Sequence, residues 1–136
     1  MTPTTRNTLE QGRAAKAYEY AEAGANLAKK KEYKSYVKKM PMMIKTNGLG
    51  AAVAFAFSKG AKNGRIEKSN PWGLIYDQLT RWVKERTSLS MESDNLAAAL
   101  AKADSATYRA VTKEVLALLN WMRRFAEGMI EGESDN

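Results

Sequence analysis

The sequence has 136 residues, of which 44% are hydrophobic and 27% charged, a balance typical of one globular domain long enough to bury a core. It contains no cysteine and no histidine. Their absence excludes disulfides, thiolate nucleophiles and cysteine-ligated zinc, and it removes the commonest acid–base group and metal ligand. Composition therefore excludes most hydrolase, protease and zinc chemistries, and the acidic residues show no spacing that proposes a metal site made of carboxylates alone. We expect no catalytic residue, no metal site and no cofactor.

The charge is positive and unevenly distributed. Lys and Arg number 22 against 15 Asp and Glu, which gives a net charge of +7. Residues 1–70 carry 14 basic and 5 acidic side chains, whereas residues 71–136 carry 8 basic and 10 acidic ones. This asymmetry favours one surface for a polyanion and another for a protein, the alternative being a charge that serves solubility alone.

No segment of the sequence resembles a membrane or secretion signal. The first seven residues contain no apolar stretch, and the uncharged apolar run at residues 48–57 has about half the length of a bilayer span. We expect a cytoplasmic protein that does not bind a membrane.

Helical patterns dominate the first half of the chain. Residues 5–27 are rich in strong helix formers, and residues 28–40 repeat apolar side chains at spacings of three and four. Pro41 is expected to open a third helix at 42–57. Its centre contains Asn47-Gly48, but the flanking residues do not alternate as hairpin strands do, so we favour a helix with close-packed small residues.

Residues 58–70 are polar and contain glycine, which predicts a mobile loop over about 59–70. Asn70 is expected to cap a helix that begins at Pro71 and buries one face. A linker at 87–95 precedes a short helix at 96–103, capped by Asp94 or Asn95.

The last helix has the most regular pattern. Its apolar residues recur at spacings of three and four from Tyr108 to Met129. Ser105 is its expected cap and Gly128 its expected end, followed by a frayed acidic tail at 131–136. Glu114 lies beside the apolar stripe and is expected to form a buried ion pair. The predicted fold is a single all-α domain over 1–136, a compact bundle of five or six helices.

A cluster of six lysines in eleven residues is the main candidate binding feature, because amines at this spacing can follow successive phosphates. A solvated helix face is the alternative. Tyr33 and Tyr36 interleave with the lysines and either stack on bases or pack as the buried edge of the helix, which we favour. The candidate nucleic-acid contacts are Lys30, Lys34, Lys38, Lys39 and Lys45, with Arg6, Arg13 and Lys16 as weaker candidates.

Several segments together resemble a known family. They are YKSYVKKMP at 33–41, IKTNGLGAAVAF at 44–55, YRAVTKEVL at 108–116 and NWMRRFA at 120–126, with TLEQGRA at 8–14 near the start. In order and spacing they resemble the small subunit of the type III-B CRISPR effector, the Cmr complex. Nearly the whole chain is covered, although residues 59–70 match poorly and Met122 stands where leucine is expected.

The resemblance implies an all-helical, non-catalytic subunit. Such proteins stack into a short filament beside the subunits that hold the guide RNA and help to bind the target RNA, while other subunits cut. The implied partners are other Cmr subunits, copies of the same chain, guide RNA and target RNA, with no small-molecule substrate. Two alternatives stay open: a free-standing helical nucleic-acid-binding protein and a metal-dependent nuclease.

The resemblance also marks residues whose role is packing or subunit contact. For Asn47 and Gly48 we favour packing over contact with RNA, and for Trp121 we favour the core over a neighbouring subunit. Arg123 and Arg124 flank this tryptophan in the same motif.

Overall fold

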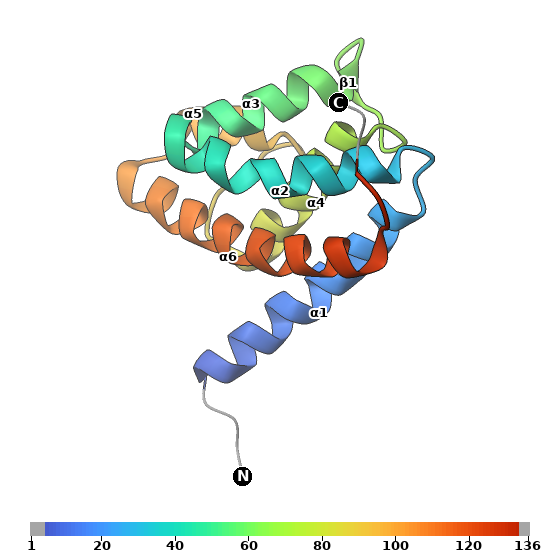
Figure 1. Cartoon of the computed structure of the whole chain (residues 1–136). Helices are drawn as coiled ribbons and strands as arrows, with labels where there is room; N and C mark the ends of the chain where they lie inside the picture. Colours follow the sequence, from blue (N-terminus) through green and yellow to red (C-terminus); the bar gives the residue numbers. More distant parts are fainter. Residues whose placement is uncertain (1–4, 134–136) are drawn as a thin grey trace.

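The computed structural model describes residues 5–133 of the chain. Six helices account for most of them, which confirms the predicted all-α bundle (Figure 1). The elements are α1 (Thr5–Ala25), α2 (Lys30–Asn47), α3 (Leu49–Gly60), β1 (Ala61–Lys62), β2 (Arg65–Ile66), α4 (Pro71–Arg86), α5 (Leu96–Lys102) and α6 (Ser105–Met129). None of these helices is both long and apolar enough to cross a membrane.

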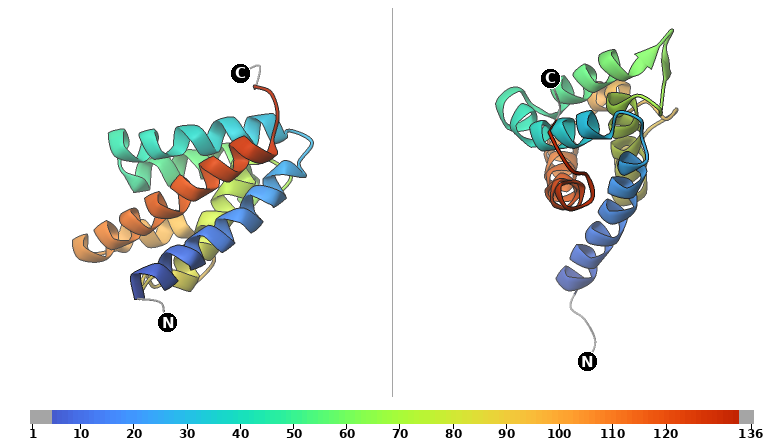
Figure 2. Two further views of the ribbon diagram at one scale, coloured as in Figure 1. Left: turned by 60° about the horizontal axis from the view of Figure 1, so that its bottom comes forward. Right: turned by 45° about the vertical axis from the view of Figure 1, so that its right-hand side comes forward.

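The long C-terminal helix α6 lies between α1 and α2, and it packs along both (Figure 2). On the other side of α2, the helix α3 packs against α4, and α5 packs against one end of α3 (Figure 1). The regular apolar stripe of α6 faces this assembly, with Val111, Val115, Leu118 and Met122 fully buried. The core therefore lies where α2, α4 and α6 converge.

A buried polar network joins α1, α2 and α4. The hydroxyl of Tyr33 donates a hydrogen bond of 2.8 Å to Oε1 of Gln78, and Nε2 of Gln78 donates one of 2.9 Å to the backbone oxygen of Tyr20. Burial raises the pKa of Tyr33, so its hydroxyl stays protonated as a donor. Since buried polar groups must be hydrogen-bonded, this network fixes how the three helices sit on one another.

The helix α2 runs through Pro41, which corrects the prediction that this proline opens a new helix. A proline inside a helix removes one backbone hydrogen bond and costs about 3 kcal/mol. Met40 and Ile44, on either side of it, are both buried on the same face as Val37. Continuous burial of this face offsets the loss of the hydrogen bond.

The chain turns at Gly48, so the predicted single helix over 42–57 is wrong at its centre. Gly48 has a φ of 92°, a conformation that residues with a side chain rarely adopt. Its N–H still donates to the backbone oxygen of Ile44 at 2.8 Å, and α3 starts at the next residue. Close by, the N–H of Gly50 donates to the hydroxyl of Tyr108 at 2.7 Å, which ties the start of α3 to α6.

The predicted loop at 59–70 contains a small hairpin that the sequence analysis missed. Helix α3 continues to Gly60, and the two-residue strands β1 and β2 pair antiparallel around Asn63-Gly64. Both turn residues have positive φ, 55° and 79°, as the tight turns that match strand twist require. The mobility of this segment stays a prediction.

Helix caps follow the sequence closely but not everywhere. Oδ1 of Asn70 accepts hydrogen bonds from the N–H groups of Trp72 and Gly73, and the side chain of Asn95 caps α5. The cap of α6 is Asp104 rather than Ser105, because the Asp104 carboxylate accepts from the Thr107 N–H at 2.7 Å. This helix also passes Gly128 and ends at Met129.

Glu114 forms the ion pair that its position predicted. Its two carboxylate oxygens accept hydrogen bonds from Arg13 on α1, from Nε at 3.0 Å and from a terminal nitrogen at 2.7 Å. The indole nitrogen of Trp82 donates a third, of 3.1 Å. The guanidinium of Arg13 holds the pKa of Glu114 below its usual value, against the opposing effect of burial. The pair therefore connects α1, α4 and α6.

We predict that Arg13→Ala lowers the free energy of unfolding by about 2 kcal/mol, because it leaves a largely buried carboxylate without its charged donor. Urea unfolding followed by circular dichroism measures the change. The matched control is Lys16→Ala, which removes a pair with Glu19 at 3.6 Å on the same helix. That pair is more exposed, so its loss should stay below about 1 kcal/mol. Equal effects of the two changes would contradict the assignment.

The same pair predicts a dependence of stability on pH. The folded-state pKa of Glu114 is depressed from its ordinary value of 4.5. The ionised carboxylate therefore contributes fully to the free energy of unfolding above pH 4.5, and this contribution is lost as the pH falls through the folded-state pKa. Below pH 4.5, the free energy of unfolding of Glu114→Gln should therefore fall less steeply with decreasing pH than that of the unmodified protein. Parallel stability curves in acid would contradict this.

We predict opposite signs for two glycine-to-alanine changes. Gly48→Ala should destabilise the fold by about 1–2 kcal/mol, because alanine is strained at positive φ. Gly128→Ala should stabilise it by up to about 1 kcal/mol, because Gly128 lies inside α6 with open space around it. Thermal melts of the two variants check the pair, and stabilisation by Gly48→Ala would contradict the role of the turn.

Candidate nucleic-acid interface

The lysine side chains of α2 project from different sides of the helix. Its buried face consists of Tyr33, Val37, Met40 and Ile44, all in contact with the core. Because this face is fixed inward, the charged residues of the same helix lie to either side of it. The predicted single cluster of lysines is therefore divided: Lys38 and Lys45 line one surface, Lys39 lines a second, and Lys34 is buried.

The first surface is an open groove between α2 and α6, which we call the α2–α6 groove. Three cations line it, Lys38 and Lys45 from α2 and Arg123 from α6. The other lining residues are uncharged: Pro41, Met42, Leu116, Ala117 and Asn120. The structure thus brings together two predicted lysines with an arginine that the sequence analysis assigned to packing or subunit contact.

The charges at one end of this groove are partly balanced. Nζ of Lys38 lies 3.0 Å from Oε1 of Glu127 on α6. The hydrogen bond with Glu127 raises the pKa of Lys38, and the same bond lowers the pKa of Glu127. Arg123 makes a long hydrogen bond of 3.4 Å to Asn120 inside the groove. Lys45, near the end of α2, is exposed.

Other predicted contact residues are held within the protein. The side chain of Lys34 is buried, with 6% of the residue exposed, and its Nζ donates to the backbone oxygen of Ile130 at 3.0 Å. Just beyond Ile130 the chain passes close to Lys31, at Gly132. Arg13 is engaged by Glu114 and Glu10. Charge reversal at Lys34 would therefore remove an internal hydrogen bond, and it would not report on nucleic acid alone.

The remaining candidates are dispersed. Lys30 is exposed at the first residue of α2 and does not line the α2–α6 groove. Nζ of Lys16 on α1 lies 3.6 Å from a carboxylate oxygen of Glu19. The side chain of Arg6 lies outside the described residues. Lys39 leaves α2 on the opposite side from the α2–α6 groove.

The second surface, which we call the α2–α3–α4 hollow, contains Lys39 together with two lysines that the sequence analysis did not select. These are Lys29, just before α2, and Lys59, near the end of α3. The spacing of Lys59 four residues after Phe55 was the signal that could have identified it. Tyr33 is wholly buried, whereas Tyr36 lies in this hollow and stacks on Trp72. The other lining residues are Glu32, Met43, Phe55, Asn70 and Pro71.

The other family-motif residues lie at the end of α2 and on α6. Asn47 is the exposed last residue of α2, next to the turn at Gly48. Trp121 packs at the edge of the core, where its indole nitrogen donates to Oε2 of Glu10 at 3.1 Å. The guanidinium of Arg124 lies 5.7 Å from the centre of the Trp121 ring.

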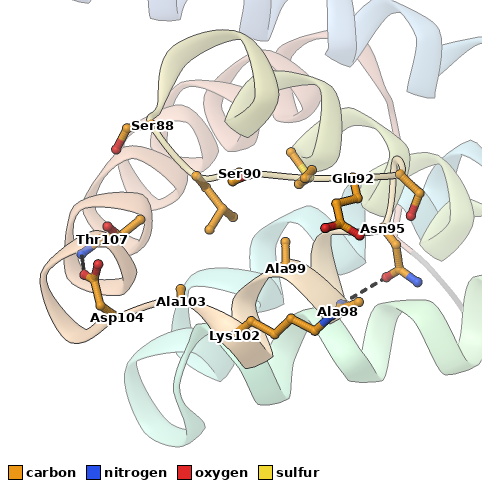
Figure 3. A pocket seen from close by; sticks show the side chains of 13 residues that line it. Ser88, Ser90, Glu92, Asn95, Ala98, Ala99, Lys102, Ala103, Asp104 and Thr107 are labelled. Carbon is orange, nitrogen blue, oxygen red and sulfur yellow. Dashed lines mark hydrogen bonds between the residues drawn. The ribbon is translucent and has the colours of Figure 1, made fainter.

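A further hollow lies between the 87–95 segment and the helices α5 and α6 (Figure 3). Its polar side chains include Asn95 and Asp104, which already accept hydrogen bonds from the first turns of α5 and α6 (Figure 3). Lys102 and Glu92 also line this hollow, so its lining has no excess of positive charge. These side chains serve as helix caps, and they do not form a basic surface.

Within residues 5–133, no three acidic side chains lie close enough to share a metal ion. The ammonium and guanidinium donors of the two basic surfaces are groups that bind anions.

Comparison with known proteins agrees with the resemblance seen in the sequence. Residues 9–129 match the family model described as CRISPR-associated protein (Cas_Cmr5). The CRISPR system Cmr subunit Cmr5 of Thermus thermophilus is 32% identical over 124 residues, which cover 91% of this chain and 97% of that protein.

The fold is also similar to a solved structure. The crystal structure of a CRISPR-associated Cmr5 family protein from Thermus thermophilus superposes with a TM-score of 0.71 at 28% identity, covering 96% of this chain and 100% of the other. Since the family model spans most of the chain and both relatives are matched nearly end to end, this chain belongs to the Cmr5 family of CRISPR-associated proteins.

Proposed function

We propose that this chain is a non-catalytic structural subunit of a type III-B CRISPR ribonucleoprotein, the Cmr complex, and that it contacts RNA through the α2–α6 groove. Membership of the Cmr5 family supports the first part. The observation that carries the second part is the convergence of Lys38, Lys45 and Arg123 on one groove with uncharged walls.

The chemistry of the groove suits a phosphate backbone. Lysine ammonium groups act as point charges toward phosphates, and an arginine can donate two parallel hydrogen bonds to one phosphate. Each neutralised phosphate releases condensed counterions, which drives binding without regard to base sequence. In a guide-directed particle the sequence is selected by base pairing, so a subunit of this kind needs no contact with base edges.

The proposal includes protein neighbours. As the resemblance implies, copies of the chain stack into a filament beside the subunits that hold the guide RNA. Residues 71–136 carry 8 basic and 10 acidic side chains, so this half lacks the excess of cations that favours RNA. Outside the wall that α6 contributes to the α2–α6 groove, its surface is therefore the better candidate for contacts with other Cmr subunits and with further copies.

We predict that the double change Lys38→Glu and Lys45→Glu weakens RNA binding for all sequences alike. It should also reduce the slope of log K against log salt by about 1.4, because each of the two lost phosphate contacts on a single strand contributes about 0.7. Fluorescence anisotropy at several salt concentrations measures both quantities.

The control for this prediction makes the same change of net charge elsewhere. Lys84 and Lys102 are exposed and lie outside the α2–α6 groove. Reversing both to Glu should leave the salt slope close to that of the unmodified protein. Equal slopes for the two double variants would show that the groove is only a solvated surface.

We predict that the tagged chain, purified from its native cell, elutes in a large particle that contains guide RNA and other Cmr subunits. Size-exclusion chromatography, mass spectrometry and RNA extraction check the size and composition. A monomer bound to DNA would instead support a free-standing nucleic-acid-binding protein. Metal-dependent RNA cleavage by the isolated chain that is lost on mutating an acidic residue would support a nuclease.

A further inference from the structure

The α2–α3–α4 hollow has an aromatic floor made by three helices. The ring of Tyr36 on α2 stacks on that of Trp72 on α4, with centres 4.4 Å apart and planes 11° from parallel. The ring of Phe55 on α3 lies nearly perpendicular to the same indole, with centres 5.2 Å apart and planes at 87°. Trp72 is held in place by both contacts and is only 7% exposed.

One of these rings is left open. Phe55 is 39% exposed, although phenylalanine is a residue that folding normally buries. Its contact with Trp72 uses the edge-to-face geometry in which one ring presents its edge to the face of the other. Part of a flat apolar ring is therefore available to a ligand, and its orientation is fixed by the packing of α3 on α4.

The rim of the hollow is cationic. Nζ of Lys39 lies over the Tyr36 ring, 5.8 Å from its centre, and Nζ of Lys59 lies over one face of the Phe55 ring, also 5.8 Å from its centre. Lys29 is the third lysine of the lining, and Glu32 contributes the one carboxylate. The lining thus has a net positive charge around an aromatic floor.

We propose that this hollow binds one unpaired base of a single-stranded RNA, which stacks on Phe55 while the adjoining phosphates lie against Lys39 and Lys59. A π-face with flanking cations is the combination that recognises single-stranded nucleic acid without reading its sequence. In a duplex the bases are already stacked and paired, so the hollow distinguishes unpaired from paired RNA. The inference rests on the proposed function and adds a second contact on the opposite side of α2.

The charge of the rim favours RNA over a protein as the occupant. An apolar hollow that receives a protein side chain is commonly surrounded by a neutral or mixed polar rim, whereas three lysines against one glutamate attract a polyanion. Binding of a protein neighbour at Phe55 is the alternative that the experiment must separate.

The test uses the full chain and a single-stranded RNA of roughly ten nucleotides that carries 2-aminopurine, whose fluorescence is quenched when it stacks on an aromatic ring. The same RNA annealed to its complement serves as the paired ligand. Phe55→Ala should weaken binding of the single strand roughly tenfold and abolish the quenching. Binding of the duplex and the salt slope of single-strand binding should both stay unchanged, since no charge is altered.

Two further variants keep the result interpretable. Phe55→Leu retains apolar bulk and should also lose the quenching, which separates stacking from a general loss of structure. Tyr18→Ala removes an aromatic side chain that is 49% exposed on α1, outside the hollow, and should leave single-strand binding unchanged. Circular dichroism melts confirm that each variant is folded.

Each outcome separates this inference from the proposed function. Unchanged quenching and affinity in Phe55→Ala would overturn the base-binding site, and the effect of reversing Lys38 and Lys45 would be unaffected. Loss of self-association or of subunit binding in Phe55→Ala, with RNA binding intact, would assign the hollow to a protein neighbour and would also overturn it. Absence of RNA binding by the unmodified chain and by its assembled particle would reject both proposals.

Discussion

The inward face of α2 is the constraint on which the rest of the structure depends. Tyr33, Val37, Met40 and Ile44 are buried along the whole length of the helix, and Tyr33 is further fixed by its hydrogen bond to Gln78. Each fully buried side chain of this size contributes about 1.5–3 kcal/mol, so rotation of the helix by even one position would be strongly unfavourable. The orientation of every other side chain on α2 follows from this.

One consequence is that a single run of lysines serves two chemically different surfaces. The α2–α6 groove has cations beside aliphatic and amide side chains, whereas the α2–α3–α4 hollow has cations around aromatic rings. The first suits a sugar–phosphate backbone and the second suits a base. Because α2 is rigidly packed between α6 and α3, the two surfaces keep a fixed separation and could engage different parts of one strand.

The sequence predicted the helices well wherever burial is periodic, as in α6, and it predicted the cap of α4 at Asn70. It placed the cap of α6 at Ser105, one residue beyond the Asp104 side chain that accepts the hydrogen bond. It failed at Pro41 and Gly48, where local preference and tertiary burial disagree. Proline should have ended the helix, but the continuous buried face kept it intact. The glycine was expected inside a helix, but the chain needs positive φ there to turn back onto α4.

The candidate site shows the same limit. Charge density in the sequence pointed to α2 as the candidate helix, but it could not separate Lys38 from Lys34, because only the fold shows which amine is buried. Nor could it show that Arg123, distant in sequence, lies across from Lys38 and Lys45. Side chains at adjacent positions on a helix point in different directions, and the residues that each of them contacts are distant in the sequence.

The hydrogen bond from Lys34 to Ile130 has a practical consequence for handling the protein. It fastens the end of α6 to the lysine-rich start of α2 and leads the following residues past Lys31. An acidic side chain introduced at this segment would lie beside Lys31 and would compete with any polyanion for that amine. Substitutions made for affinity measurements are therefore better placed elsewhere on the chain.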